Sequence, residues 1–548
     1  MSLPLLLTGG SILTMSDVSE AEAIAVVGDR IQHVGTLTDC RRVLGSRSRE
    51  FDLEGRCLLP GFVEAHGHML MWGMMATMAD LRWPNVRSID DIVNKLSAHG
   101  RHLPPNVVVR GFGYDHHKLA DGRQLVAADL DRVAEDRPVH ILHMSGHCHV
   151  INNHLMRQAG IRSDTPDPKG GRVGRDEAGH PNGVLYDNAL ELIVDSDVRT
   201  GNHAPNAHFS ETLDSLMSMI SLGQEAYLSS GITTAVDAQV TKREAEAYLN
   251  MHRRGELKIR VVMMYLSCFL KELMRLGLCA PIGDAFLSIG PVKLYADGSV
   301  PANTARFSKP YEVDPSNAGY LYHTAEELKD LLVQAHCFGL QTGTHAQGDM
   351  GIELVLDAIE AAQSTMKRED IRHRIEHCGF PRRDQISRMQ ELGVWPIPQP
   401  RHIHAFGDGA LRDIGSERAA AYTPLGLFKE LGVPLVLSSD SPVVEQHPLM
   451  GVESAVTRRT ASGRVLGGPE LAISIEAGLR AYTYGAAASV HREHELGSLA
   501  PGKLADFIVL DRNPLRVQPN EIGEILIEET WIAGRRVFAE QRHLGDTG

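Results

Sequence analysis

The sequence predicts an α/β protein: a (β/α)8 TIM barrel, a small composite β-sandwich domain made from both termini, and an insertion after the first barrel strand. Two patterns lead to this prediction. In the middle of the chain, apolar strand-like runs alternate with amphipathic helical stretches, which is typical of parallel βα units. At both ends, short alternating strands are separated by glycine turns. With 548 residues, 43% of them hydrophobic, the chain can bury a large core.

The composite β domain is expected from residues 1–58 and 491–548. Apolar and polar residues alternate in several short runs at both ends, within 5–15, 21–35, 49–60, 505–515 and 529–540. Neither end has enough strands to be stable by itself, so we expect the two ends to form one domain beside the barrel.

The barrel is expected within residues 59–490, with its chemistry at the carboxyl ends of the strands. Eight apolar runs are predicted as barrel strands, within 58–69, 231–240, 257–266, 287–299, 339–349, 371–380, 394–400 and 433–443. The stretch from about 75 to 225 does not fit this repeat. It has strand-like and helical runs of its own, which indicates an insertion after the first barrel strand.

Charge and composition exclude several classes of partner. The formal net charge of −14 opposes contact with phosphates, so we expect a small-molecule substrate and no nucleic acid. No apolar run reaches the ~18–20 residues of a membrane helix, so no membrane partner is expected. The first residues lack a basic stretch and are interpreted as a strand, not a signal peptide. Seven scattered cysteines without a CxxC pair fit free thiols, which favours a cytoplasmic protein.

Ionisable side chains lie at the predicted carboxyl ends of the barrel strands. These ends meet at one mouth, and nitrogen and carboxylate ligands suit zinc or a similar divalent ion. Because residues two apart on a strand face the same side, both imidazoles of His66-Gly67-His68 can reach one ion. The candidate metal ligands are therefore His66, His68, Lys293, His345, His377 and Asp440.

Each of these residues also has an ordinary interpretation. Three H-x-H pairs occur in the chain, at 66/68, 147/149 and 402/404, so one such pair is weak evidence by itself. Lys293 could be a salt-bridged or snorkelling lysine, although a lysine in so apolar a run needs a partner or a lost charge. Asp440 could be a helix N-cap or a turn residue. Only the first pair is followed by imidazoles and acids at later strand ends, which makes the set stronger than its members.

Several segments resemble the amidohydrolase superfamily. LPGFVEAHGH at 59–68 resembles its first metal motif. VKLYADGS, THAQGD, RIEH and SSDSP, which begin at residues 292, 344, 374 and 438, resemble the YtcJ-like branch, the amidohydrolase 3 group that includes N-substituted formamide deformylases. LGSLAPGKLAD, from residue 496, is similar to the segment that leads these proteins back into their small β domain. The resemblance covers nearly the whole chain.

This resemblance implies a binuclear centre. His66 and His68 would bind the more buried of two divalent ions, with zinc as the expected metal. His345 and His377 would bind the second ion. Lys293, carboxylated by CO2, would bridge both ions. A one-metal centre with Lys293 as a free amine is the alternative.

The implied reaction is hydrolysis of an amide-type C–N bond, N-acyl, N-formyl or cyclic, in a small molecule and not in a peptide. A metal-bound hydroxide would attack the carbonyl carbon, because metal binding lowers the pKa of water towards ~7. Asp440 would ligate the first ion and, as the catalytic residue, carry the proton to the leaving nitrogen. A deaminase or an esterase/lactonase on the same scaffold is the alternative. A non-catalytic scaffold protein is disfavoured because all six ligand positions are filled.

Two stretches after barrel strands depart from the family pattern and leave the substrate open, 299–304 and 399–404. The first differs from the glycine-containing version associated with formamide hydrolysis, and the second is rich in histidine. Candidate substrate contacts come from polar segments of the insertion and from loops after the strands: Tyr114, Asp115, His147, Arg306 and His404. Ordinary loop packing, or a surface ion pair for Arg306, is the alternative. A homodimer is a plausible assembly for a chain of this class.

Overall fold

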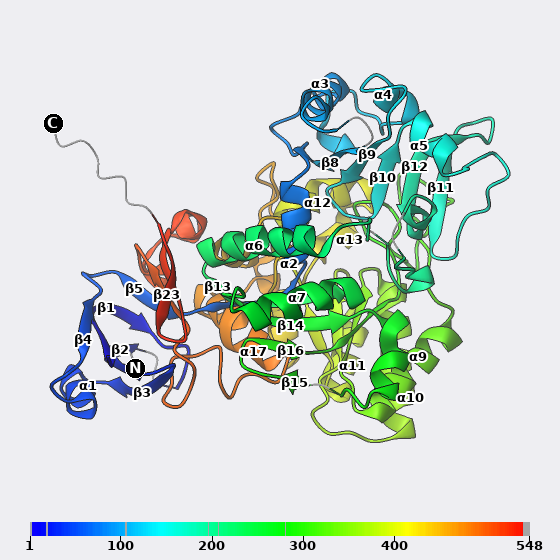
Figure 1. Cartoon of the computed structure of the whole chain (residues 1–548). Helices are drawn as coiled ribbons and strands as arrows, with labels where there is room; N and C mark the ends of the chain where they lie inside the picture. The colour runs from blue at the N-terminus through cyan, green and yellow to red at the C-terminus, as the bar shows by residue number, and fades with distance from the viewer. Residues whose placement is uncertain are drawn as a thin grey trace.

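The computed structural model describes residues 3–17, 20–104, 107–194, 197–206, 208–279 and 281–540. Strands from both ends of the chain lie together at one side of the molecule, and a second group of strands lies at the opposite side (Figure 1). The barrel occupies the middle. The largest cluster of buried apolar side chains belongs to the barrel and its helices.

Eight strands from the two ends of the chain form one sheet: β1 (Leu5–Leu13), β2 (Glu20–Val27), β3 (Arg30–Gly35), β4 (Arg49–Asp52), β5 (Cys57–Pro60), β21 (Phe507–Leu510), β22 (Ile527–Ile532) and β23 (Arg535–Ala539). β5 joins the two ends because it pairs parallel with β1 and antiparallel with β21. The helix α1 (Leu37–Leu44) contacts β2. Alternating apolar residues of the strands meet in one core that includes Leu7, Ile24, Leu58, Phe507 and Trp531.

Seven parallel strands form the barrel: β6 (Phe62–Gly67), β13 (Ile232–Val240), β14 (Arg260–Tyr265), β17 (Val292–Tyr295), β18 (Thr342–Ala346), β19 (Arg374–His377) and β20 (Trp395–Ile397). A parallel bridge between Leu266 and Lys293 joins the first three strands to the other four. β16 (Leu287–Ile289) pairs parallel with β14, and β15 (Ile282–Gly283) pairs antiparallel with β16. Every residue of β6 and β13 is buried, as expected for parallel strands covered on both faces.

The prediction of a regular eighth strand within 433–443 is wrong. Residues 433–440 do not form a regular strand, although they run between β20 and β6. The Ser438 N–H donates to the Pro398 carbonyl at 3.2 Å, and the Asp440 N–H donates to the His66 carbonyl at 2.9 Å. A regular ladder with β20 cannot form because Pro396 and Pro398 have no N–H to donate.

Helices follow most barrel strands, and several begin and end with standard caps. α9 begins with the capping box of Thr324 and Glu327 and ends at Gly339, whose φ of 98° favours glycine. The helices outside the insertion are α2 (Met69–Ala76), α6 (Leu213–Ser229), α7 (Lys242–Arg254), α8 (Leu270–Arg275), α9 (Ala325–Phe338), α10 (Asp349–Thr365), α11 (Arg383–Leu392), α12 (Arg401–Asp413), α13 (Ser416–Ala420), α14 (Leu425–Glu430), α15 (Pro448–Thr457), α16 (Ile475–Arg480) and α17 (Ala486–Ala488).

Residues 77–212, between α2 and α6, are called the insertion from here on. A six-stranded sheet in the order β11-β12-β10-β9-β8-β7 forms its centre and has its own apolar core. α6 falls within the predicted range of the insertion, yet it contacts α2 of the barrel. The elements of the insertion are β7 (Ala79–Asp80), α3 (Ile89–Gly100), β8 (Val109–Tyr114), α4 (Ala127–Asp131), β9 (Val139–His143), β10 (Cys148–Ile151), α5 (Asn153–Gln158), β11 (Gly171–Arg175) and β12 (Pro181–Asp187).

Among the residues that the structure describes, no helix has both the length and the apolar character to cross a bilayer.

Candidate metal centre

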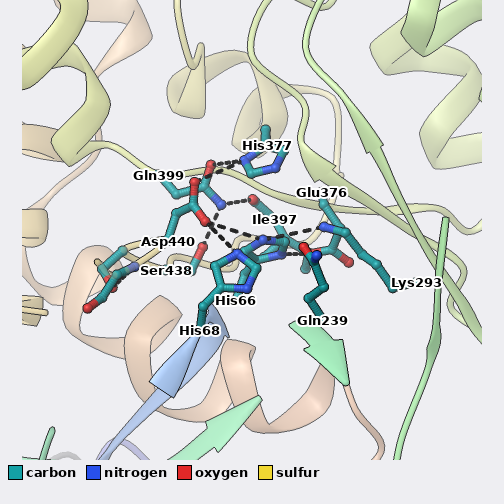
Figure 2. A network of polar contacts seen from close by, with 12 residues as sticks. His66, His68, Gln239, Lys293, Glu376, His377, Ile397, Gln399, Ser438 and Asp440 are labelled. Atoms are coloured by element: carbon teal, nitrogen blue, oxygen red, sulfur yellow. Dashed lines mark hydrogen bonds and ion pairs between the residues drawn. The ribbon is translucent and has the colours of Figure 1, made fainter. Parts of the chain in front are cut away.

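Three of the predicted ligands meet at the mouth of the barrel (Figure 2). The ligand atoms of His66, His68 and Asp440 all lie within 4.8 Å of one another, and all three side chains are buried. Oδ1 of Asp440 is 3.2 Å from Nε2 of His68 and 3.5 Å from Nε2 of His66. Two imidazole nitrogens and one carboxylate oxygen therefore face a common point, as the H-x-H pattern on β6 predicts.

Lys293 of β17 reaches the same place. Its Nζ lies 3.5 Å from Nε2 of His66, and its side chain is fully buried. Burial lowers the pKa of Lys293 to about 8, although the charges of Glu376 and Asp440 act in the opposite direction. A fraction of the amine is therefore uncharged near neutral pH, which is the form that can react with CO2.

His345 of β18 and His377 of β19 lie beside each other, with ring centroids 4.4 Å apart. Nε2 of His345 is 3.0 Å from the Gly298 carbonyl and donates to it, which leaves Nδ1 as the free nitrogen. Nδ1 of His377 is 2.8 Å from Oε1 of Gln399 and donates to it, which leaves Nε2 free. These hydrogen bonds select the tautomer that offers one lone pair from each ring.

Gln399 is oriented by its own amide group. Its Nε2 donates to the Ile397 carbonyl at 2.8 Å and to Oγ of Ser438 at 2.9 Å, so Oε1 must face His377 (Figure 2). Gln399 begins the stretch 399–404 that departs from the family pattern, but it was not among the predicted site residues.

Glu376 supports the first histidine from behind. Nδ1 of His66 donates to its carboxylate at 2.5 Å, and Arg374 contacts the same carboxylate at 2.7 and 2.8 Å. All three side chains are fully buried. Although burial opposes its charge, Arg374 and His66 hold the pKa of Glu376 well below its usual range. A carboxylate–histidine pair of this kind fixes the ring and makes its other nitrogen a better metal ligand.

A second buried carboxylate, Glu64, joins β6 to the segment that carries Asp440. It accepts from the backbone N–H of Ser439 at 2.9 Å and from that of His66 at 3.2 Å, and also from the Ser439 hydroxyl. Burial raises the pKa of Glu64 to about 7. A glutamate inside an apolar strand is a signal that sequence reasoning overlooked.

His402 also lies at this centre. Its Nε2 is 3.7 Å from Oδ2 of Asp440, and its ring is nearly parallel to that of His377, with centroids 6.4 Å apart. Burial lowers the pKa of His402 to about 4. His402 and His404 form an H-x-H pair, which is weak evidence for a metal site by itself. The two side chains point in different directions because both residues belong to the helix α12, where positions two apart do not share a face.

The donor set fits a divalent metal. It consists of buried imidazoles whose free nitrogens are defined by hydrogen bonds, one carboxylate and one lysine. Burial, with the charge of Lys293, lowers the pKa of His66 to about 4, so the ring is neutral at physiological pH, as a metal ligand must be. These are the ligand types that zinc prefers.

The predicted substrate contacts fall into three groups, the last of which is His147 alone. Asp115 and His404 line a cavity of about 500 Å3 formed by parts of the insertion, the loop after β17 and α12. By contrast, Tyr114 is fully buried in the core of the insertion, and the Arg306 guanidinium donates to the carbonyls of Ala318 and Gly319. Neither of these two residues lines the cavity.

His147 reaches the metal centre from the insertion. Its ring centroid lies 5.3 Å from that of His345. Its Nδ1 donates to Asp187 at 2.5 Å, and the fully buried Asp187 also accepts from the hydroxyls of Tyr320 and Tyr322. Like Gln399 and Glu64, Asp187 is a buried partner at this site that the sequence pattern did not indicate.

A TIM barrel with buried imidazoles, a lysine and an aspartate at the carboxyl ends of its strands has the features of a metal-dependent hydrolase. Residues 49–538 match the model of the Amidohydrolase family, so this chain belongs to that family. It is a metal-dependent amidohydrolase.

Relatives of similar length support this assignment. The chain is 27% identical to an N-substituted formamide deformylase of Arthrobacter pascens, over 94% of each chain. It is also 27% identical to the putative amidohydrolase YtcJ of Bacillus subtilis, over 97% of this chain and 98% of the relative. A crystal structure of an uncharacterized metal-dependent hydrolase from Pyrococcus furiosus superimposes with a TM-score of 0.73 at 28% identity, covering 94% of this chain and 100% of that chain.

Proposed function

We propose that this amidohydrolase cleaves an amide-type C–N bond, N-acyl, N-formyl or cyclic, in an uncharged small molecule. The observation that carries the proposal is the convergence of His66, His68 and Asp440 with Lys293 beside them. The similarity to an N-substituted formamide deformylase favours C–N bonds over esters.

His66, His68 and Asp440 would hold one divalent ion, with zinc as the proposed metal. His345 and His377 would hold a second, and a carboxylated Lys293 would contribute a ligand to both. When bound, such ions acidify a water molecule and polarise a carbonyl oxygen. The chain's own contribution is to keep these donors neutral or anionic, buried and correctly oriented.

Asp440 is the proposed proton carrier. Its Oδ1 faces His66 and His68, while its Oδ2 lies 3.8 Å from His377 and 3.7 Å from His402. One oxygen can thus stay with the ligand set while the other takes a proton from water and delivers it to the leaving nitrogen. Amines leave poorly unless they are protonated, and such a step contributes ~10²–10⁴-fold to the rate.

The cavity favours a substrate without net charge. Its apolar lining includes Trp83, Met144, Val300, Phe406 and Val444. Each cation of its lining lies within 4 Å of a carboxylate and is therefore already compensated: Arg82 beside Asp80, Lys118 beside Asp115, Arg401 beside Glu445 and Arg412 beside Asp413. We propose Asp115, His147 and His404 as the polar contacts to substrate. Tyr114 and Arg306 would lie behind the walls of the cavity and support them.

The test is a substrate screen on protein of measured metal content, with N-formyl, N-acyl amino acid, cyclic amide and lactone compounds. We expect turnover of an uncharged amide, loss of that turnover after chelation, and recovery with zinc, manganese or cobalt. Turnover that survives complete metal removal would contradict the proposed mechanism. Lactone hydrolysis or ammonia release without amide hydrolysis would replace it with the esterase or deaminase alternative.

A further inference from the structure

We propose that the insertion contains a second metal-binding site, built by Asp115, His116 and His117 beside His143, and suited to a divalent transition ion such as zinc. The first three residues belong to the turn after β8, which includes the short helix η1 (His116–Lys118), and His143 ends the neighbouring strand β9. No hydrogen bond or ion pair between described residues joins this group to the ligands of the catalytic centre.

Three of these side chains offer a converging ligand set, and the fourth lies beside it. The ligand atoms of Asp115, His116 and His117 all lie within 4.8 Å of one another. Nε2 of His143 lies 3.8 Å from Oδ1 of Asp115, and the His116 and His143 ring centroids are 5.4 Å apart. Two imidazoles and one carboxylate are a ligand set found at zinc sites that keep a fourth position open.

Three nitrogen atoms in this group are buried without a hydrogen-bond partner among the described residues: Nδ1 of His116, Nε2 of His117 and Nε2 of His143. The backbone N–H of Ser145 donates to Nδ1 of the buried His143, so the hydrogen of the neutral ring lies on Nε2, 3.8 Å from Oδ1 of Asp115. Buried polar atoms in folded proteins nearly always have a partner. The unpartnered Nδ1 of His116, together with the converging ligand atoms of Asp115 and His117, is best explained by a cation that these three residues bind.

The charge state of the group also suits a cation. Burial, with the nearby imidazoles, lowers the pKa of His116 to about 2, and burial lowers that of His117 to about 4. Both rings are thus neutral and free to bind a metal. Although burial opposes its charge, His143 and the nearby cations hold the pKa of Asp115 well below its usual range. Lys118 lies 3.6 Å from Asp115 and is 29% exposed, so its ammonium group can turn to water when a metal binds.

An ion at this position would fix the turn after β8, which lies beside His143 at the end of β9. Asp115 and His117 line the cavity, and Nε2 of His117 lies 3.8 Å from Asp413 of α12 on the opposite wall. The ion would therefore hold the wall that the insertion contributes to the cavity in one conformation.

Zinc content per chain tests this inference without any substrate. Wild-type protein and the double variant His116→Asn/His143→Gln are loaded with zinc, freed of excess metal and measured by mass spectrometry. We expect the double variant to contain one zinc equivalent less. His180→Gln is the matched control, because His180 belongs to the insertion but its side chain is 64% exposed, and its zinc content should equal that of wild type. Equal zinc content in the double variant would overturn the proposal.

Two further variants separate this site from the catalytic centre and from misfolding. In a His66→Asn/His68→Asn background, adding the two insertion substitutions should still remove one equivalent, whatever the catalytic centre binds. If circular dichroism shows that the double variant is unfolded, the single variant Asp115→Asn is used with a competing chelator. We expect it to release one zinc at a chelator concentration at least about tenfold lower than wild type. Identical release curves would rule the site out.

Discussion

At the scale of single residues, two of the proposed ligands hold unusual backbone conformations. His377 has a φ of 70° and Asp440 a φ of 63°, both in the left-handed region that non-glycine residues rarely adopt. Such positions persist only where the surroundings determine them, and they cluster at functional sites. Here the backbone hydrogen bond from Asp440 to His66 and the side-chain bond from His377 to Gln399 supply that constraint.

The first prediction concerns Asp440. The variant Asp440→Asn keeps the size of the side chain and one oxygen, and asparagine tolerates a positive φ, but the amide cannot accept the proton. We expect kcat to fall ~10²–10⁴-fold while the melting temperature and the metal content stay close to wild type. Asp408→Asn is the control, because Asp408 lines the cavity and bonds to Ser462 away from the metal centre. Near-normal turnover of Asp440→Asn would remove this residue from the mechanism.

The second prediction concerns Glu376. Glu376→Gln removes the carboxylate charge that compensates the buried Arg374 and weakens the support of His66. We expect metal affinity to fall ~10–100-fold. Stability should fall by ~3–5 kcal/mol, because a buried guanidinium is left without its partner. Glu360→Gln is the control, since Glu360 is 59% exposed in its pair with Arg388 and should matter by less than ~1 kcal/mol.

The pH dependence of the Glu376 effect follows from the sign of its pKa shift. Its pKa is lowered from 4.5 in the folded protein, so its stabilising charge is fully present above pH 4.5 and is lost as the pH falls towards the folded value. The difference in unfolding free energy between wild type and Glu376→Gln should therefore shrink below that pH. A difference that stays constant between pH 7 and pH 3, measured in urea, would contradict the charge argument.

At the scale of elements, the placement of His68 depends on how α2 meets α6. α2 begins immediately after His68, and its Gly73 lies against the backbone of α6: a Cβ at this position would come within 1.8 Å of the Met219 carbonyl oxygen. Gly223 of α6 is equally close to α2, with a Cβ position 2.3 Å from the Met69 carbonyl oxygen. The two glycines thus let the helices approach and hold the end of β6 in place.

The third prediction tests this contact. Gly73→Ala should destabilise the protein by ~1–3 kcal/mol, because the added methyl group meets backbone that must shift. Gly409→Ala in α12 is the control. Its Cβ position meets only the end of the Arg412 side chain at 3.7 Å, so alanine should be neutral or stabilising there by up to ~1 kcal/mol. Chemical unfolding checks both variants, and an equal effect at the two positions would mean that the helix contact has no special role.

At the scale of the whole molecule, a buried ion pair ties the terminal sheet to the barrel. Arg260 of β14 contacts Asp506, the residue before β21, at 2.6 and 2.9 Å, and the side chains are 1% and 4% exposed. Asp506 also accepts from the backbone N–H of Ala533 in the terminal sheet. The barrel therefore supplies a buried cation and the terminal sheet supplies the anion that compensates it.

The fourth prediction is that Arg260→Met destabilises the protein by ~3–5 kcal/mol, because Asp506 becomes a buried and uncompensated charge. Arg383→Met is the control: Arg383 and its partner Glu430 are 57% and 53% exposed, and loss of this pair should cost less than ~1 kcal/mol. Urea unfolding of both variants gives the comparison. If Arg260→Met is no less stable than the control, the ion pair does not couple the sheet to the barrel.

Much of this protein could be predicted from the sequence, because the relevant signals are local. Alternation and helical periodicity indicate the strands of the terminal sheet and seven strands of the barrel. The position of His66, His68, His345 and His377 at strand ends follows from the same patterns, since the side-chain direction on a strand depends only on its neighbours. The wrong prediction of a regular strand within 433–443 also has a local cause, which is the prolines of the adjacent strand.

Other features depended on contacts between residues far apart in the chain, and only the tertiary structure decided them. His66 and Glu376 are 310 residues apart in sequence, and Glu64 and Ser439 are 375 apart, so no pattern within a strand or helix relates them. The same holds for the meeting of His402 with Asp440 and of His147 with Asp187. A side chain's type can be read from the sequence, but its hydrogen-bond partner and burial, which define its chemistry, arise only when distant segments pack together.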